Sequence, residues 1–573
     1  MNLDSLKDAL RRWSGMTGAF SRLQEESWPC EIEGLQGGMH AFFLSEYARL
    51  NGGLLVVVVP TEKDVEVVHA DLELGGLEST VLPWWGSIAY RPVATGSSVF
   101  GERAAALATM CASAAPRSEA LSVIVMTERA FLTPLPPPAY VASLLSVVTV
   151  GSSFDPASFA STLSGQGYVR VPRVTVRGEF ALRGEVLDVF LPGDAYAYRI
   201  VFDFDRVEKI TRFNPEDQSS VGQVEALTLY PAREVLWDEE RIACLAERMS
   251  RCPELVKEAD STIELLRERG GFSGEELFFP LAFDRAYSVA DYVAAWNQAC
   301  PEGSPSAGNQ ANKPASKPSA SSKPSAAGKP HSQPRPSRAA VLFIDYDRQE
   351  NAWDSLSREY FGLYRKQGQS SMGDLSERDA RVAFPEPSRI LLDFHATADR
   401  LDRSILLRTI HGSEGRSRER YILSSDPPRS FFGNIVYLKE ELANLLKAGW
   451  KVSVFAESEH QALRVGEILK DFDVSVIPLA LSSGFGIPEL KILVIQENEI
   501  FGRRRHIPRS VKHAKSAVID TFVELNPGDF VVHVNYGIGR FLGIERVKAL
   551  GNERDYIKLE YAEEETVFIP IEQ

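Results

Sequence analysis

A glycine-rich segment near the start of the chain has residue types that could bind a nucleotide phosphate. The segment reads EGLQGGMHAFF over residues 33–43, and the apolar run LLVVVVP follows it. A phosphate-binding loop has the pattern G-x-x-x-x-G-K-[ST] between a strand and a helix. Gly34, Gly37 and Gly38 give this segment the outline of such a loop.

The positions that carry the chemistry of such a loop hold unsuitable residues. Counted from Gly34, Met39 replaces the glycine that lets the backbone approach phosphate. His40 replaces the lysine that meets the β- and γ-phosphates, and Ala41 replaces the hydroxyl residue that ligates Mg²⁺. The pattern does not recur in the chain. We therefore expect no ATP hydrolysis and no cofactor here, although amides at a helix N-terminus could still attract an anion.

The composition indicates several domains of a protein from a reducing cytoplasm. The chain has 573 residues, of which 44% are hydrophobic and 25% charged, as in globular domains. Its five cysteines form no C-x-x-C pair and its nine histidines lack metal-ligand spacing, so we predict neither a disulfide framework nor a metal site. The charged N-terminus is no signal peptide, and no apolar run reaches 18 residues. The net charge of −15 disfavours a general nucleic-acid coat.

The pattern of apolar residues predicts a multidomain α/β protein. Up to residue 150, strand signals such as residues 54–60 alternate with helical ones, which is typical of a parallel sheet. Residues 151–232 are rich in β-strand signals, with glycine at the turns. Residues 523–573 contain short strands separated by the turns NPGD and YGIG, which predict a small SH3- or Tudor-like β-barrel.

Two segments lack the apolar residues that a core requires. Residues 302–338 consist mainly of Pro, Ser, Ala and Lys, and residues 501–522 are rich in Arg and Lys. We interpret both as solvated linkers. The alternative is that either one contacts DNA phosphates.

Three stretches together resemble the transcription-repair coupling factors, the Mfd family. PGDFVVHVNYGIGRFLGIE, with RDYIKLEYAEEETVFIPIEQ, is similar to the RNA polymerase-interaction domain that this family shares with CarD-type regulators. The region from GYVRVPRVTVRGEFALRGEVLDVFLPG to YRIVFDFDRVEKITRFNPEDQ resembles the UvrA-binding module that the family shares with the repair helicase UvrB. The degenerate loop, followed by LPWWGSIAYRPVATGSSVFGERAAAL, resembles the family's motor-dead UvrB-like domain.

The resemblance implies a UvrB-like α/β domain interrupted by a β-rich insertion and followed by two smaller domains. The expected boundaries are 1–150 for the first part of the UvrB-like domain, 151–232 for the UvrA-binding module, 233–301 for a helical continuation, 302–338 for the linker, 339–418 for a further continuation, 419–500 for a small α/β domain, 501–522 for the basic connector and 523–573 for an incomplete polymerase-interaction domain.

The resemblance also implies the role of an adaptor in transcription-coupled repair. The complete family member is expected to be an ATP-dependent double-stranded DNA translocase whose motor binds ATP and Mg²⁺ and contacts DNA. We expect this chain to end before that motor. This part would dock on the β subunit of stalled RNA polymerase and recruit UvrA by binding, without catalysis.

The family's UvrA-binding surface corresponds to three residues of this chain. Arg170, Arg183 and Phe190 lie in the matching stretch. Arginine suits such a contact because its planar fork makes two bonds to a carboxylate. UvrB-like sequences commonly carry a second arginine two residues before Arg183, where this chain has Ala181.

The polymerase contact is expected on the second strand of the terminal domain. Arg540, Ile544 and Val547 lie on or after this strand, and Gly537 and Gly539 suit the turn before it. In the family this domain pairs an exposed strand edge with the polymerase β subunit, a mode in which main-chain bonds provide affinity. The alternative for Ile544 and Val547 is a place in the core of the barrel.

Other interpretations remain open. Arg183 could pair with Asp188 or Glu185 within the module, and Phe190 could belong to its core. The chain as a whole could be a UvrB-type ATPase, a CarD-type transcription regulator without a role in repair, or a nucleotide-binding enzyme with an unusual loop. Met39, His40 and Ala41 argue against the first, and the UvrB-like module argues against the second.

Overall fold

The protein folds into two compact units, Met1–Arg504 and Arg505–Gln573, which are described separately. Most of the expected linker and of the basic connector lies outside the residues that the structure describes. The computed structural model describes residues 2–86, 89–111, 121–299, 337–370, 383–408, 420–427, 429–431, 433–501, 530–533, 537–549, 552–561 and 566–570.

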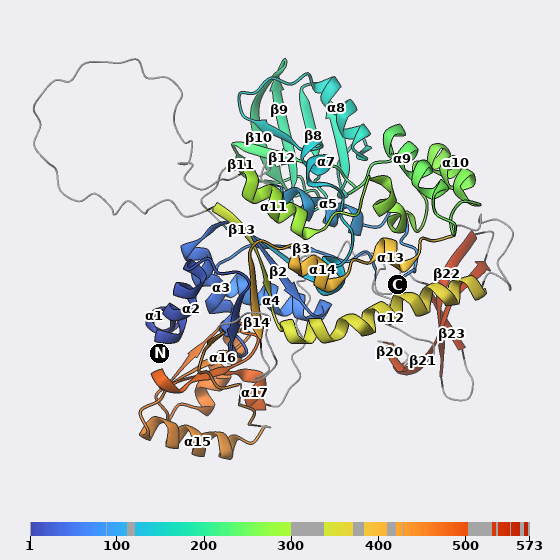
Figure 1. Cartoon of the computed structure of the whole chain (residues 1–573). Helices are drawn as coiled ribbons and strands as arrows, with labels where there is room; N and C mark the ends of the chain where they lie inside the picture. Colours follow the sequence, from blue (N-terminus) through green and yellow to red (C-terminus); the bar gives the residue numbers. More distant parts are fainter. Residues whose placement is uncertain are drawn as a thin grey trace, which may run out of the picture. The chain divides into compact units, whose positions relative to one another are not determined.

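The first unit is built on a seven-stranded sheet in which all neighbouring strands are parallel, as the sequence predicts (Figure 1). The strand order is β15-β1-β14-β13-β2-β4-β3, so strands from beyond residue 336 lie between β1 and β2. The strands are β1 (Cys30–Glu33), β2 (Gly52–Val59), β3 (Ser79–Leu82), β4 (Leu121–Thr127), β13 (Ser337–Phe343), β14 (Ser404–Arg408) and β15 (Tyr421–Ile422).

Strand β2 separates two hydrophobic cores. All eight of its residues are buried. Because side chains alternate along a strand, Leu54 and Val56 pack into one core while Leu55 and Val57 pack into the other. The helices of the first core are α5 (Val99–Thr109), α6 (Glu128–Phe131), α7 (Pro138–Ser143), α9 (Glu239–Ser250), α10 (Ala259–Arg269), η1 (Glu275–Ala282), α11 (Val289–Ala299), α12 (Tyr346–Ser370), α13 (Pro387–Ile390) and α14 (Phe394–Asp399).

A second α/β domain completes the other core. Figure 1 shows the four N-terminal helices in blue beside this domain in orange, and the two share one continuous apolar cluster. The N-terminal helices are α1 (Leu3–Arg12), α2 (Ser14–Gln24), α3 (Met39–Leu50) and α4 (Glu62–Leu74). The second domain has the strand order β17-β16-β19-β18. Its elements are α15 (Ile435–Lys447), β16 (Lys451–Phe455), α16 (Glu459–Ile468), β17 (Val474–Ile477), β18 (Phe485–Ile487), η2 (Pro488–Leu490), β19 (Ile492–Gln496) and α17 (Glu497–Phe501).

The β-rich module has its own core and a six-stranded sheet in the order β11-β10-β9-β8-β7-β6. Neighbours from β7 to β11 are antiparallel, and strands β5 and β12 pair beside them as a two-stranded sheet. The elements are β5 (Ser146–Thr149), α8 (Pro156–Gly165), β6 (Val169–Arg170), β7 (Glu179–Arg183), β8 (Val186–Val189), β9 (Ala197–Asp203), β10 (Arg206–Phe213), β11 (Ser220–Val224) and β12 (Ala226–Leu229).

The second unit is an antiparallel meander of four strands. The predicted closed barrel is not confirmed, because β20 and β23 remain at opposite edges and no pairing between them occurs among the described residues. The strands are β20 (Phe530–His533), β21 (Gly537–Ala549), β22 (Asn552–Glu560) and β23 (Thr566–Pro570).

Candidate functional sites

The glycine-rich segment does connect a strand to a helix. It follows β1 and enters α3, with Gly38 at the helix N-cap. Gly34 and Gly37 have φ angles of 90° and 52°, in the left-handed region that glycine adopts without strain. The backbone therefore has the general course of a phosphate-binding loop.

Backbone from distant parts of the chain packs closely against this loop. The amide of Gly38 donates a hydrogen bond of 3.0 Å to the carbonyl of Ser483, which precedes β18. A Cβ atom on Gly37 would lie 2.3 Å from the carbonyl oxygen of Gly484. Likewise, a Cβ atom on Gly34 would lie 2.2 Å from the carbonyl oxygen of Leu423. Gly37 and Gly38 thus permit close packing of the second α/β domain against the loop, and Gly34 permits close packing of the chain that follows β15.

The side chains at the chemical positions of the loop are also withdrawn from solvent. Met39 and Ala41 are buried, and His40 is half-buried. Burial lowers the pKa of His40, although the charge of Asp345 and a bond to the Gly37 carbonyl oppose this shift. His40 therefore does not replace the permanent positive charge of a phosphate-binding lysine.

Charged residues at the carboxyl edge of the sheet pair with one another. In α/β proteins this edge commonly binds ligands. Here Arg408, at the end of β14, is 1% exposed and contacts Glu31 at 3.0 Å and also Asp347. Arg420 contacts Glu31 at 3.3 Å. The carboxylates of Glu31 and Asp347 thereby neutralise the positive charge of Arg408.

Arg183 in the β-rich module combines an internal bond with exposure. Its Nη2 donates to Asp188 Oδ2 at 2.7 Å, while 53% of its side chain is exposed. The pairing with Asp188 that we considered from the sequence is thus present. The exposed part of the guanidinium can still meet a partner.

The other two predicted UvrA contacts lie in different surroundings. Arg170 is exposed on β6 and is in register with Phe180 of β7. Since side chains alternate along β7, Arg170 lies on the sheet face opposite to Arg183. Phe190 is 6% exposed and packs with Phe213 and other apolar residues. The structure therefore does not bring these three side chains together, and Phe190 belongs to the module's core.

Sequence reasoning missed Arg199, which lies next to Arg183 in space. Its guanidinium makes two bonds to Asp188, from Nε at 2.7 Å and from Nη2 at 2.9 Å. The alternation of AYRIVFD shows that Arg199 shares a strand face with Ala197 and Val201. Only the pairing of β9 with β8 reveals that this is the face of Asp188.

The predicted polymerase contacts lie on β21, which among the described residues is only partly paired on one side. Strand β20 pairs with residues 537–540 of β21, so the chain beyond Arg540 has no described neighbour on that side. On the other side, Ile544 and Val547 pair with Ile557 and Arg554 of β22. Arg540 is exposed.

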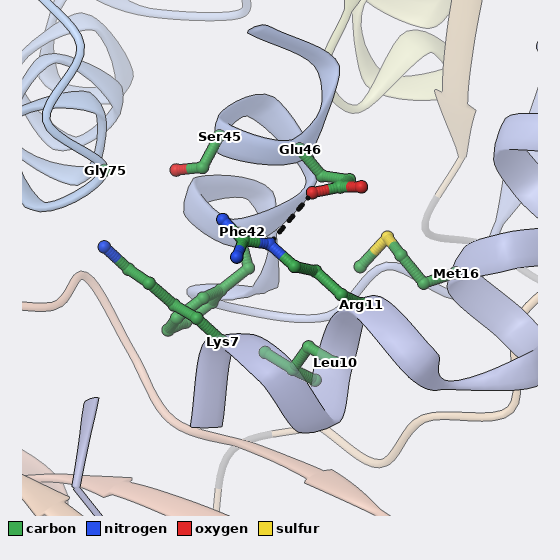
Figure 2. A pocket seen from close by; sticks show the side chains of 8 residues that line it. All are labelled: Lys7, Leu10, Arg11, Met16, Phe42, Ser45, Glu46 and Gly75. Atoms are coloured by element: carbon green, nitrogen blue, oxygen red, sulfur yellow. Dashed lines mark hydrogen bonds and ion pairs between the residues drawn. The ribbon is translucent and has the colours of Figure 1, made fainter. Parts of the chain in front are cut away.

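A small crevice of about 80 Å³ lies between the N-terminal helices (Figure 2). Figure 2 shows Lys7 and Arg11 of α1 extending toward Ser45 and Glu46 of α3. Arg11 contacts Glu46 at 3.1 Å, and the Ser45 hydroxyl donates to the carbonyl of Ala41. Arg11, Glu46 and Ser45 thus already have partners within the protein.

Several other kinds of site can be checked within the described residues. No group of three or more His, Cys, Asp or Glu residues is placed to hold a metal ion there. None of the described helices is long and apolar enough to cross a membrane. Burial raises the pKa of Cys30 to about 11 and that of Cys111 to about 12, so both remain protonated thiols at neutral pH.

Two regions of the chain match known family models. Residues 147–235 match the family model described as the UvrB interaction domain, and residues 525–573 match the CarD-like/TRCF RID domain. Together with the parallel sheet, these matches define a multidomain α/β protein that contains a UvrB-like interaction domain and a CarD-like domain.

Whole-chain comparison points to one named group of proteins. It is similar to proteins named transcription-repair-coupling factor from Borreliella burgdorferi (25% identical over 100% of this chain and 45% of the relative), Myxococcus xanthus (27%, 94% and 44%) and Bacillus subtilis (24%, 79% and 37%). The chain therefore spans less than half the length of these relatives. The resemblance to the transcription-repair coupling factors is confirmed.

Proposed function

We propose that this chain is an adaptor in transcription-coupled DNA repair. Residues 147–235 recruit UvrA, and residues 525–573 dock on the β subunit of a stalled RNA polymerase. The observation that carries the proposal is the presence of both interaction domains in one chain. They belong to different compact units, which suits simultaneous binding of two partners.

The proposed mechanism is binding without catalysis. The loop that resembles a nucleotide site has its Gly38 amide bonded to Ser483, and His40 lacks a permanent charge. An enzyme of the UvrB type needs a lysine and a magnesium ligand at these positions. The geometry therefore favours an adaptor over an ATPase for this chain.

The complete protein is proposed to be an ATP-dependent double-stranded DNA translocase of the cytoplasm. The similar factors are about twice the length of this chain, since it spans 45% or less of each relative compared above. We assign ATP, Mg²⁺ and most of the DNA contact to a motor elsewhere in the complete protein. This motor would displace the polymerase while the adaptor brings UvrA to the lesion.

The proposed UvrA surface includes Arg183, and the proposed polymerase surface includes the part of β21 beyond Arg540, which has no described neighbour on the side of β20. The exposed guanidinium of Arg183 can bond a carboxylate of UvrA. Main-chain groups of β21 beyond Arg540 can pair with a strand of the polymerase, with Ile544 or Val547 as apolar contacts.

Binding of the purified chain to purified UvrA and to RNA polymerase tests the proposal. Both partners are expected to bind. Arg183→Glu should weaken UvrA binding alone, and Ile544→Arg should weaken polymerase binding alone, so each variant serves as the other's specificity control while circular dichroism checks the fold of both. Failure of the unaltered chain to bind either partner would contradict the adaptor role. Saturable, magnesium-dependent ATP hydrolysis by this chain would favour the UvrB-type alternative instead.

A further inference from the structure

A strip of three residues, Ser482–Gly484, joins the second α/β domain to the N-terminal helices through its backbone. The amide of Ser482 donates a bond of 2.8 Å to Asp71 Oδ1 of α4. The carbonyl of Ser483 accepts the bond of 3.0 Å from the Gly38 amide, at the start of α3. We call this strip the strap, because its first two residues tie the second domain to two different helices.

The third residue of the strap is held within its own domain by Glu499 of α17. The amide of Gly484 donates to Glu499 Oε1 at 2.6 Å, and the amide of Gln496 donates to Oε2 at 3.0 Å. The contact is close, since a Cβ atom on Gly484 would lie 2.5 Å from Glu499 Oε2. Bonds from amides to a carboxylate are among the stronger hydrogen bonds in proteins. Glu499 therefore fixes the last residue of the strap to α17.

The residues on either side of the strap are firmly anchored. Leu481 and Phe485 are fully buried in the apolar cluster that the N-terminal helices share with the second α/β domain. The ring of Phe485 packs edge-on against Phe42 of α3, with 5.7 Å between the ring centres. Ser482 and Ser483, by contrast, are only half-buried. The strap can therefore shift between fixed ends while the two parts of the protein stay packed together.

Helix α17 is the element of the second domain that precedes the polymerase-matching region in the chain. It covers Glu497–Phe501, and the family match begins at residue 525. A helix of five residues has little stability of its own, so its surroundings must hold it. The carbonyl of Glu499 accepts a bond of 2.8 Å from the amide of Phe431, and Ile500 is buried in the core of the domain. The position of α17 thus depends on a few contacts.

We propose that Glu499 is a latch that couples α17 to the strap and, through the strap, to the glycine-rich loop. With the carboxylate bonded to Gly484, the strap stays against α3 and α4. Displacement of α17 withdraws the carboxylate and loosens the strap as a unit. This inference goes beyond the adaptor function and requires neither partner.

The physical reason is the fate of a buried amide. Gly484 is buried, so its amide cannot simply turn to water when Glu499 leaves. The backbone must shift to find another acceptor, and a shift at Gly484 moves the adjoining carbonyl of Ser483. Because that carbonyl accepts the bond from Gly38, the disturbance reaches the start of α3.

Hydrogen exchange of individual amides, measured on the full chain by mass spectrometry with electron-transfer fragmentation, tests the proposal. We expect Glu499→Ala to speed exchange about tenfold at the amides of Gly484, Ser482 and Gly38, as loss of one hydrogen bond would. Glu499→Gln should cause a smaller increase, because glutamine keeps one acceptor oxygen. Ile500→Ala loosens α17 without changing the carboxylate and should speed exchange at the same three amides.

Glu489→Gln is the matched control. Glu489 is a second carboxylate of the same domain that bonds to the N-terminal helices, with Trp13 Nε1 at 2.7 Å and Ser14 Oγ at 2.6 Å. Its substitution should leave exchange in the strap within about twofold, as expected for a surface change away from it. The amides of β16, which is paired on both sides, serve as an internal reference in every variant. If Glu499→Ala does not fold, as judged by circular dichroism, Glu499→Gln and Ile500→Ala provide the test.

Two results would overturn the inference. Faster exchange confined to Gly484, with Gly38 unchanged, would show that Glu499 holds only its immediate neighbour. Equal acceleration in the strap and in β16 would show that Glu499 supports the whole domain. Neither result depends on binding of UvrA or of RNA polymerase, so the adaptor function is tested separately.

Discussion

The amide of Gly38 and the carbonyl of Ser483, which lie 445 residues apart in the chain, are joined by a hydrogen bond of 3.0 Å. Gly38 begins a helix whose amides could otherwise face an anion. Leu481, Ser483 and Gly484 instead pack against this turn. The segment that outlines a nucleotide site thus serves as an internal joint between two α/β domains.

Restoring the chemical residues of the loop should not restore nucleotide binding. We expect His40→Lys/Ala41→Ser to show no saturable ATP binding by calorimetry in the presence of Mg²⁺, because the Gly38 amide and the space beside Gly37 are already occupied. The unaltered chain is the control, and circular dichroism checks the fold of the variant. Stoichiometric, magnesium-dependent binding would show that the joint opens.

Gly38→Ala should destabilise the first unit. An added Cβ would lie 2.6 Å from both Leu481 Cδ1 and the Ser483 carbonyl oxygen. Overpacking of this kind costs about 1–3 kcal/mol of unfolding free energy. Gly466→Ala in α16 is the matched control, because a Cβ there meets nothing within 4 Å. It should stabilise by roughly 0.5–1 kcal/mol, the difference between Ala and Gly in a helix. Equal urea midpoints for the two variants would refute the packing role of Gly38.

Breaking the ion pair between Arg103 and Glu234 should be among the most damaging single changes. Both side chains are fully buried, and the pair joins α5 to the segment that follows the β-rich module. Glu234→Ala leaves Arg103 as an unpaired buried charge, at a cost of about 3–5 kcal/mol. Glu247→Ala breaks the exposed pair with Arg251 and should cost less than about 0.5 kcal/mol. Thermal unfolding compares the two, and similar losses would contradict the prediction.

The stability of the first unit should fall as pH rises toward 8. Burial raises the pKa of Glu276 from 4.5 to about 8. Between these values the unfolded chain loses a proton that the folded chain keeps, so unfolding becomes easier as pH increases. Below pH 4.5 Glu276 is protonated in both the folded and the unfolded chain. The full loss of unfolding free energy is reached above about pH 8.

Glu276→Gln should remove the part of this pH dependence that comes from Glu276. Glutamine keeps an oxygen that can accept the 3.0 Å bond from the amide of Val93, but it carries no charge. The variant should be more stable than the unaltered chain at pH 8, by on the order of 2 kcal/mol, and should resemble it near pH 4.5. Urea unfolding at both pH values provides the measurement. A difference that does not change with pH would show that Glu276 does not titrate in this way.

The sequence by itself indicated the secondary-structure elements and the residue types that the glycine-rich loop lacks. The run of β2 predicts a strand buried on both faces, because only such a strand is apolar at every position. Met39, His40 and Ala41 predict from residue type alone that the usual phosphate chemistry is absent. The motifs of the two interaction regions also indicated the family that the comparisons support.

Only the tertiary structure decided which distant residues meet. Residues near Ser483 pack against the loop at Gly38, and Arg199 shares Asp188 with Arg183. Both contacts depend on long-range packing and strand pairing, which local periodicity does not encode. Phe190 has the residue type of a contact or of a core, and the packing of the module placed it in the core. A closed barrel requires pairing between its first and last strands. The alternation of apolar and polar residues within each strand does not specify such a pairing.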